Sequence, residues 1–256
     1  MASAAFQNCT ALVTVTFGEK VKYIPNYSFS NCTSLTSITI PNSVTNIGGS
    51  AFRDCSGLTK ITIPSSVTSI YNYAFDGCSG LTNITIPNSV TNIGYGAFVS
   101  CSSLTSIVVD GGNTKYDSRE NCNAIIETAT NKLMVGCQNT IIPNSVTNIG
   151  EHAFRDCSGI TSVTIPSSVI SIEKYAFEYC GGLTSVTIGN GVTSIGYYAF
   201  EGCNGLKEVH INDIAAWCNI NFDRGNANPL YYAHSLYLNN ELITELVIPD
   251  DITTIG

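Results

Sequence analysis

Eight phenylalanines recur along this chain at a spacing of 23 residues, and each is followed three residues later by a cysteine. They form two blocks: Phe6, Phe29, Phe52, Phe75 and Phe98, then Phe154, Phe177 and Phe200. A fixed period of this length is typical of a solenoid, in which each repeat stacks on the next. One repeat cannot bury its own apolar side chains, so neighbouring repeats must share a core. We therefore expect function on the surface that stacking creates.

Each repeat is expected to begin with a short strand, because Leu35, Ile38 and Ile40 follow the Leu-x-x-Leu-x-Leu spacing of a leucine-rich strand. The equivalent segments are residues 12–17, 58–63, 81–86, 104–109, 160–165, 183–188 and 206–211. Parallel stacking of these strands makes one sheet, with coils about 4.8 Å apart. Proline follows most of them and ends the ladder, since it has no backbone N–H. A second extended piece, residues 44–47 and its equivalents, is expected to return along the opposite face, before a glycine turn at Gly48.

A long motif repeats almost unbroken in residues 40–61 and 86–107. It reads Ile-Pro-Asn-Ser-Val-Thr-Asn-Ile-Gly-x-x-Ala-Phe-x-x-Cys-x-x-Leu-Thr-x-Ile. In this motif the chain resembles the BspA-like, or treponemal-type, leucine-rich repeat proteins, over all 256 residues except two longer connections. The resemblance implies a right-handed leucine-rich-repeat solenoid, β-rich, with a parallel sheet on one face. It also implies a cell-surface or secreted protein of mouth or gut bacteria, or of protozoan parasites, that is associated with adhesion. Counting strands gives about ten coils.

The domain prediction is a single solenoid over residues 1–256 with variant long coils at about 110–142 and 212–248. In the first variant coil, residues 124–127 and 132–135 are expected to form a hairpin, and residues 140–143 to rejoin as a coil strand. In the second, residues 213–220 are expected to form a short helix and residues 235–243 a hairpin with Asn239-Asn240 at its turn. Residues 243–248 are then the expected last coil strand.

The two ends of the chain lie at nearly the same phase of the repeat, and neither reads as an atypical polar cap. We therefore expect the sequence to be a fragment of a longer array. Residues 1–6 lack the basic start and apolar run of a signal peptide. If the parent protein is exported, its signal and anchor are expected outside this sequence.

Eleven cysteines would ordinarily suggest disulfides in an exported chain. Eight of them, however, share one repeat column beside the phenylalanines, where a thiol packs as a small apolar group. We expect a ladder of core thiols, with strained bridges between column neighbours as the alternative. Cys122 and Cys137 lie outside the column, and they are the pair to test as a disulfide across a hairpin.

Three surfaces contain the candidate binding residues. The first is the outward face of the sheet, with one column that includes Lys60, Asn83 and Glu208 and a second that includes Thr39, Thr62, Thr85, Thr164, Thr187 and His210. The second surface is the variant coil that contains Trp217, Tyr231 and Tyr232, since aromatic side chains are common interface anchors; packing over the solenoid is the alternative for Trp217. The third is an aromatic column before each Ala-Phe pair, which could equally pack between coils: Tyr27, Tyr73, His152, Tyr175 and Tyr198.

Composition excludes several classes of function. Only 12% of residues are charged, the net charge is -8 and there is no basic run, so nucleic acid and anionic membrane are poor partners. No segment reaches the roughly 20 apolar residues of a membrane span. The three histidines form no catalytic motif, no Cys-x-x-Cys pair is present, and Asp110–Asp117 lacks the EF-hand pattern. The sequence therefore predicts no enzyme, no cofactor and no metal.

The expected function is that of a non-enzymatic interaction module in an adhesin. Its expected partners are host extracellular-matrix or cell-surface proteins, glycans, or other microbial surfaces. Two alternatives stay open: a structural spacer in a surface protein, and a self-associating or filament-forming repeat. Repeat scaffolds carry many different partners, so the fold alone does not select among these.

Overall fold

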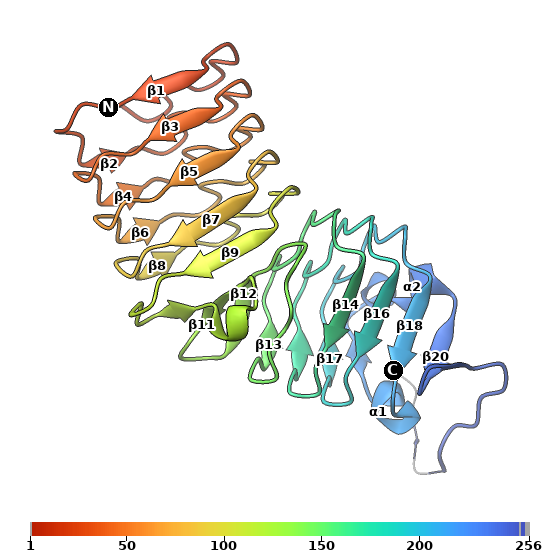
Figure 1. Ribbon diagram of the computed structural model, residues 1–256. Helices are drawn as coiled ribbons and strands as arrows, with labels where there is room; N and C mark the ends of the chain where they lie inside the picture. The colour runs from red at the N-terminus through yellow and green to blue at the C-terminus, as the bar shows by residue number, and fades with distance from the viewer. Residues whose placement is uncertain (1, 251, 254–256) are drawn as a thin grey trace. The chain divides into compact units, whose positions relative to one another are not determined.

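The computed structural model describes residues 2–250, 252 and 253. The chain divides into two compact units. Unit 1 comprises Met1–Ala129 with Val135–Asn139, and unit 2 comprises Thr130–Met134 with Thr140–Gly256. Both are built of short parallel strands that stack coil on coil (Figure 1). This confirms the predicted solenoid, which has about ten turns.

Unit 1 has a long-strand row and a short-strand row. The long-strand row contains β1 (Thr14–Thr16), β3 (Ser37–Thr39), β5 (Lys60–Thr62), β7 (Asn83–Ile86) and β9 (Ser106–Val109). The short-strand row contains β2 (Tyr23–Ile24), β4 (Asn46–Ile47), β6 (Ser69–Ile70) and β8 (Asn92–Ile93). Pairing is parallel with a shift of one repeat, so that Ile38 lies opposite both Val15 and Ile61. The predicted strands and the predicted return piece are therefore both present, the return piece shortened to two residues.

Alternation of side chains decides which face of each strand is buried. In β3 the side chain of Ile38 is buried, whereas Ser37 and Thr39 on either side are exposed. The same pattern holds in β5 and β7. Pro41, Pro64 and Pro87 follow these strands, as expected for a residue that cannot donate to the ladder.

The phenylalanine column forms the centre of each unit. In unit 1 the ring of Phe52 lies 5.6 Å from that of Phe29 and 5.4 Å from that of Phe75, with nearly parallel planes. In unit 2 the ring of Phe177 lies 4.8 Å from Phe154 and 5.2 Å from Phe200. Stacked aromatic pairs contribute about 0.5–1.5 kcal/mol each beyond the burial of their area. The column thus fixes the spacing of the coils.

The cysteine column joins the coils in a way that the sequence analysis did not foresee. The thiol of Cys55 donates to the backbone carbonyl of Phe29 in the preceding coil at 3.1 Å, and Cys203 donates to Phe177 at the same distance. Burial raises the pKa of both thiols to about 12, which keeps the donating proton in place. The predicted core thiols are confirmed, except that Cys9 is exposed.

Cys122 and Cys137 are not joined by a disulfide. The sulfur of Cys137 donates to the carbonyl of Asn123 at 3.3 Å, and burial raises the pKa of Cys122 to about 11. The candidate disulfide pair, Cys122 and Cys137, is therefore present as two buried thiols.

Many of the repeated hydroxyl groups also bond coil to coil. The Ser66 hydroxyl donates to the carbonyl of Val44 at 2.6 Å, and the Thr68 hydroxyl donates to that of Thr45 at 3.3 Å. The same bonds recur in unit 2 at Ser168 and Thr193. These serines and threonines are thus part of the fold, and their abundance says nothing about a ligand.

Each coil turns through a residue with left-handed backbone, two positions before the phenylalanine. Tyr27, Ser50 and Tyr73 occupy this position with φ of 58°, 54° and 58°, and Gly96 occupies it with φ of 62°. The turn also needs close approach, because a Cβ on Gly48 would lie 2.7 Å from the backbone of Asn26. The predicted glycine turn at Gly48 is therefore confirmed. Glycine is needed there because a side chain would collide with the backbone of the preceding coil, and not because the turn requires a positive φ.

The first variant coil contains β10 (Tyr116–Asp117), η1 (Arg119–Asn121), β11 (Ile125–Glu127) and β12 (Lys132–Val135). Strands are thus found at both predicted hairpin positions, and β11 also pairs with β10, which was not predicted. The prediction of a coil strand at residues 140–143 is wrong, since this segment is not a strand. A turn at residues 138–139 leaves only three residues before Pro143, which has no N–H to offer.

Unit 2 repeats the two rows. Its long-strand row contains β14 (Ser162–Ile165), β16 (Ser185–Ile188), β18 (Glu208–Ile211) and β20 (Leu236–Leu238), with β21 (Glu241–Leu242) at the edge. Its short-strand row contains β12, β13 (Asn148–Ile149), β15 (Ser171–Ile172), β17 (Ser194–Ile195) and β19 (Asn221–Phe222).

The second variant coil adds α1 (Ile214–Cys218), η2 (Gly225–Ala227) and α2 (Leu230–Ala233). The predicted helix is confirmed, and the carboxylate of Asp213 caps it by accepting from Ala216 N. The predicted hairpin is also confirmed, with φ of 51° and 68° at Asn239 and Asn240. The prediction of a coil strand at residues 243–248 is wrong: β20 takes that place beside β18, and β21 occupies the outer edge of β20.

Candidate functional site

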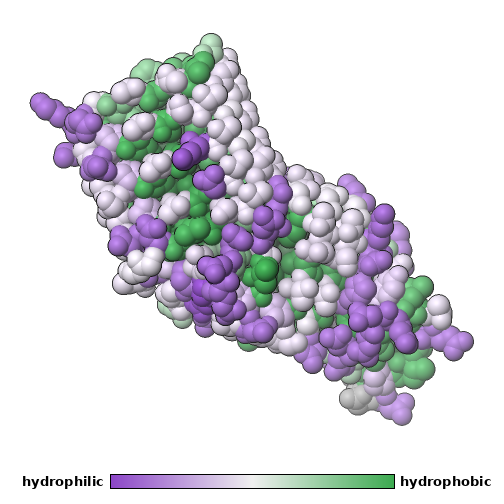
Figure 2. Space-filling view, in the orientation of Figure 1, coloured by the Kyte–Doolittle hydropathy of each residue, from purple (hydrophilic) through white to green (hydrophobic). Residues whose placement is uncertain are grey.

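The sheet face of unit 1 presents the predicted columns to solvent. Lys60 pairs with Ser37 in the first column, and Thr62 pairs with Thr39 in the second. All four are exposed, as are Asn83 and Thr85. Figure 2 shows pale, weakly polar residues over much of this face of unit 1, with few strongly hydrophilic groups.

These outward threonines differ from the threonines that join the coils. Among the described residues, the hydroxyls of Thr39, Thr62 and Thr85 make no hydrogen bond with the chain, and the Lys60 ammonium makes no ion pair. The hydroxyls of Thr36 and Thr82, by contrast, donate to carbonyls of the preceding coil. The column is therefore a row of polar groups that the fold does not use.

In unit 2, some side chains of the same columns contact one another. Thr164, Thr187 and His210 stand in register, and Tyr237 extends the column beyond the prediction. The imidazole of His210 stacks on Tyr237 at 4.6 Å and lies 3.1 Å from the carboxylate of Glu208. The hydroxyls of Thr164 and Thr187 make no hydrogen bond with the described chain.

The aromatic residues of the second variant coil mostly support the fold. Trp217 is only 9% exposed and packs edge-on against Phe222 at 5.4 Å, so packing, and not ligand contact, describes it. The Tyr232 hydroxyl accepts from Gly202 N at 3.0 Å. Tyr231 is 57% exposed and is the member of the trio that a partner can reach.

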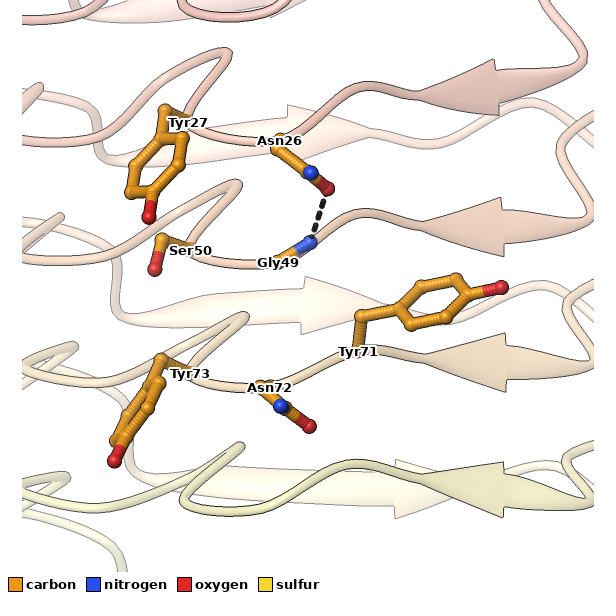
Figure 3. A pocket seen from close by; sticks show the side chains of 7 residues that line it. All are labelled: Asn26, Tyr27, Gly49, Ser50, Tyr71, Asn72 and Tyr73. Carbon is orange, nitrogen blue, oxygen red and sulfur yellow. Dashed lines mark hydrogen bonds between the residues drawn. The ribbon is translucent and has the colours of Figure 1, made fainter.

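A hollow of about 390 Å³ lies beside the short-strand row of unit 1, where the chain leaves β2, β4 and β6 (Figure 3). We call it the tyrosine hollow and define it by Asn26, Tyr27, Gly49, Ser50, Tyr71, Asn72 and Tyr73. Its middle coil contributes only Gly49 and Ser50, which bear little or no side chain. Tyr27 and Tyr73 stand on one side of this floor and Tyr71 on the other.

Hydrogen bonds from the backbone orient both asparagines of the tyrosine hollow. Asn26 Oδ1 accepts from Gly49 N at 2.7 Å, and Asn72 Oδ1 accepts from Tyr95 N at 3.0 Å. A backbone N–H needs an acceptor, so these bonds identify the oxygen of each amide and leave its NH₂ group facing elsewhere. Neither NH₂ group, nor the Ser50 hydroxyl, makes a hydrogen bond within the described chain.

Unit 2 has a hollow of about 540 Å³ that shares two repeat positions with the tyrosine hollow, three and four residues before the phenylalanine, and extends back along β15 and β17. We call it the charged hollow, because Glu173, Lys174 and Asp223 line it. Two of these charged groups bond to the fold: the Glu173 carboxylate accepts from Lys132 Nζ at 2.8 Å and from Glu151 N at 3.0 Å. The Lys174 ammonium pairs with Glu151 at 2.9 Å, and Arg224 lies over the ring of Tyr197.

The aromatic column behaves differently in the two units. In unit 2, His152 is buried and stacks on Tyr175 at 4.9 Å, as the packing alternative expected. Burial, helped by the positive charges of Arg155 and Lys174, lowers the pKa of His152 to about 4. In unit 1, Ser50 interrupts the column, and Tyr27 is 46% exposed.

Most of the tyrosine hollow was not predicted from the sequence. Asn26, Gly49, Ser50, Tyr71 and Asn72 were not among its candidates, although Tyr27 and Tyr73 were named in the aromatic column. The sequence did contain a signal for this hollow. Gly49-Ser50 occupies the two repeat positions that are Asn26-Tyr27 in the preceding coil and Asn72-Tyr73 in the following coil, so two large side chains are missing from the middle coil. A search for conspicuous residues does not find such a gap.

Neither a cluster of metal ligands nor a membrane-spanning helix is found among the described residues. No three His, Cys, Asp or Glu side chains there are grouped as a metal ion requires. The carboxylate of Asp117, from the segment considered for calcium, is paired with Arg119 at 2.6 Å. No helix in the described part of the chain has the length and apolarity needed to cross a membrane.

Comparison with known proteins gives one family and several solved structures. The model of the BspA type leucine rich repeat region matches residues 1–126 and 124–256. A leucine rich cell surface protein of Faecalibacterium prausnitzii is 31% identical with a TM-score of 0.68; the match covers 88% of this chain and 66% of that protein. No curated protein matches.

Two more distant structures share the fold. A leucine-rich repeat protein of Eubacterium ventriosum is 20% identical with a TM-score of 0.58, covering 94% of this chain and 79% of that one. The pneumococcal vaccine antigen PcpA is 22% identical with a TM-score of 0.53, covering 89% of this chain and 72% of that one.

Proposed function

Because the chain belongs to the BspA-type leucine-rich repeat family, and so has the architecture of a protein-interaction repeat module, we propose that it is the binding module of a cell-surface or secreted adhesin. Its partners in this proposal are extracellular-matrix or cell-surface proteins of a host, or the surface of another microbe. The partner lies across the outward columns of the long-strand row.

One observation carries the proposal: the side chains of Thr39, Thr62, Thr85 and Lys60 are exposed and bond to nothing in the described chain. Many of the other repeated hydroxyls bond between coils, so these columns are where the repeat leaves polar groups for a partner. A protein laid across parallel columns can bond to several coils at once, which is how solenoids gain affinity from a shallow surface.

The name of the Faecalibacterium structure supports the proposed location. That protein is called a leucine rich cell surface protein, and this chain spans 66% of its length.

The test is binding of the purified chain to an array of extracellular-matrix proteins, with the molecular mass taken by light scattering on the same sample. The informative variant combines Lys60→Ala, Asn83→Ala and Glu208→Ala. A matched control, Lys20→Ala with Glu19→Ala and Asn204→Ala, removes the same kinds of exposed side chain elsewhere. We expect saturable binding by a monomer, weakened at least tenfold in the column variant and unchanged in the control.

Two outcomes would replace this proposal. A monomer that binds no matrix or cell-surface component would favour a structural spacer. A mass that grows with concentration would favour a self-associating repeat.

A further inference from the structure

The tyrosine hollow lies where a repeating surface column lacks one ring. Tyr27 and Tyr73 occupy the same position in coils that are two steps apart, and Ser50 occupies it in the coil between them. The core shows what a complete column looks like: the ring of Phe52 fits between Phe29 and Phe75 at 5.6 and 5.4 Å. Two coil steps are about 10 Å. Ser50 itself is only 5% exposed and forms the floor of this gap, and the hollow of about 390 Å³ above it has room for one ring supplied by a ligand.

Hydrogen-bonding groups surround this gap. The amide NH₂ groups of Asn26 and Asn72 come from the same two coils as the tyrosines, and their oxygens are already occupied by backbone N–H groups. The Ser50 hydroxyl adds a group that can donate or accept. A fitting ligand therefore has oxygen acceptors around the edge of a ring.

The gap carries no charge. None of the residues that line the tyrosine hollow is acidic or basic. A charged ligand would lose hydration here without gaining an ion pair. The combination of a ring, several oxygens and no charge describes a neutral sugar.

The shape of the hollow favours a compact ring over an extended peptide. Tyr27 and Tyr73 close it at two ends along the stack of coils, and Tyr71 stands at its side (Figure 3). A proline-rich segment rises about 3.1 Å per residue and needs an open groove several residues long. The hollow offers the length of a single ring instead.

We propose that the tyrosine hollow is a subsite for one uncharged sugar ring of a glycan. It lies on a different surface from the threonine columns, so it goes beyond the binding function proposed above and does not depend on it. Galactose, N-acetylglucosamine and lactose are suitable neutral probes, and sialyllactose is the charged counterpart of lactose.

The decisive variant is Ser50→Tyr, which puts the missing ring into the gap. The repeat accepts tyrosine at this position in four other coils, so folding should be preserved. Ser100→Tyr is the matched control, because it adds a tyrosine at the left-handed position that Tyr179 occupies in another coil, outside the hollow. Gly49→Tyr is a second filling variant, since Tyr95 and Tyr197 occupy its position elsewhere.

Saturation-transfer NMR on the full chain measures the result. We expect signals from at least one neutral sugar, reduced at least tenfold in Ser50→Tyr and Gly49→Tyr and within twofold of the parent in Ser100→Tyr. Loss of binding should leave the matrix-protein binding of the columns intact, which separates the two proposals. Absence of any neutral-sugar signal, equal signals in the filled variants, or binding of a polyproline peptide in place of sugars would overturn the proposal.

Discussion

The tyrosine hollow of unit 1 and the charged hollow of unit 2 share two positions of the repeat, three and four residues before the phenylalanine, yet the side chains at these positions make different contacts. In the charged hollow, Glu173 and Lys174 bond to Lys132 and Glu151 and so hold neighbouring coils together. In the tyrosine hollow, the amide oxygens of Asn26 and Asn72 bond to the fold, whereas their NH₂ groups make no hydrogen bond within the described part of the chain.

This difference shows how a regular scaffold acquires a site. The core beneath both hollows is the same phenylalanine column with the same coil spacing. Only the side chains that project beyond the backbone turn have changed. A repeat can therefore convert a stabilising position into a binding position without altering its fold, as long as the core column supplies the stability.

The largest effect should come from the shared core. Phe52→Ala and Phe177→Ala each remove a fully buried ring stacked on both faces, so each should lower the free energy of unfolding by about 3–5 kcal/mol. Urea unfolding measures both. Phe6→Ala is the control, because Phe6 is 42% exposed and should cost much less. Markedly unequal losses at Phe52 and Phe177 would show that the two units do not rest on equivalent cores.

A pH-dependent effect should arise from His152 in unit 2. The pKa of His152 is lowered from 6.5 to about 4, so between these values the unfolded chain binds a proton that the folded chain does not. The contribution of His152 is therefore complete above pH 6.5 and is lost as the pH falls toward 4, by about 3 kcal/mol at most. Glu151, Arg155, Asp156 and Lys174 influence the group.

His152→Tyr provides the control for this effect, since tyrosine occupies the equivalent position in four other coils. Thermal unfolding of both proteins at pH 7 and pH 4.5 gives the comparison. The variant should lose less stability on acidification than the parent. An identical loss would mean that His152 is not the group responsible.

A smaller effect should separate the two hollows directly. Glu173→Ala removes the acceptor for both Lys132 Nζ and Glu151 N, and should cost about 1–2 kcal/mol. Tyr71→Ala changes the equivalent position of unit 1 and should cost less than about 0.5 kcal/mol, because Tyr71 is 45% exposed. If Tyr71→Ala were the more destabilising, the assignment of Tyr71 to binding would lose its basis.

The smallest structural effect concerns the thiols. Cys9 is exposed, whereas the other ten cysteines are buried. One equivalent of an aromatic disulfide reagent should therefore react quickly with the native protein, and about ten more only after unfolding. Fast reaction of several thiols in the native state would show that the cysteine ladder opens, or is absent.

Much of this fold could be predicted because the period fixes it. The phenylalanine and cysteine columns, the strands after each Leu-Thr and the capped helix after Asp213 all follow from local pattern. The errors fall in the variant coils, where the period is interrupted. Residues 243–248 resemble a coil strand in sequence, yet the place beside β18 is taken by Leu236–Leu238. Competition between two segments for one strand position is decided by connection and packing, which a local pattern does not contain.

The candidate site was predicted only in part. The exposure of the Lys60 and Thr62 columns follows from strand alternation, and it was anticipated. The tyrosine hollow depends on what is missing at Gly49 and Ser50 and on amides oriented by backbone N–H groups of the next coil. Such features become visible only when three coils are stacked in space.

The most direct test of this account is an amide-resolved NMR titration of the whole chain with lactose and N-acetylglucosamine. We predict saturable shifts at the backbone of Gly49 and Ser50 and at the side-chain NH₂ groups of Asn26 and Asn72, with the resonances of Glu173 and Lys174 unmoved. Shifts absent from the tyrosine hollow, or equally large at the charged hollow, would contradict the claim that unit 1 leaves these groups for a ligand.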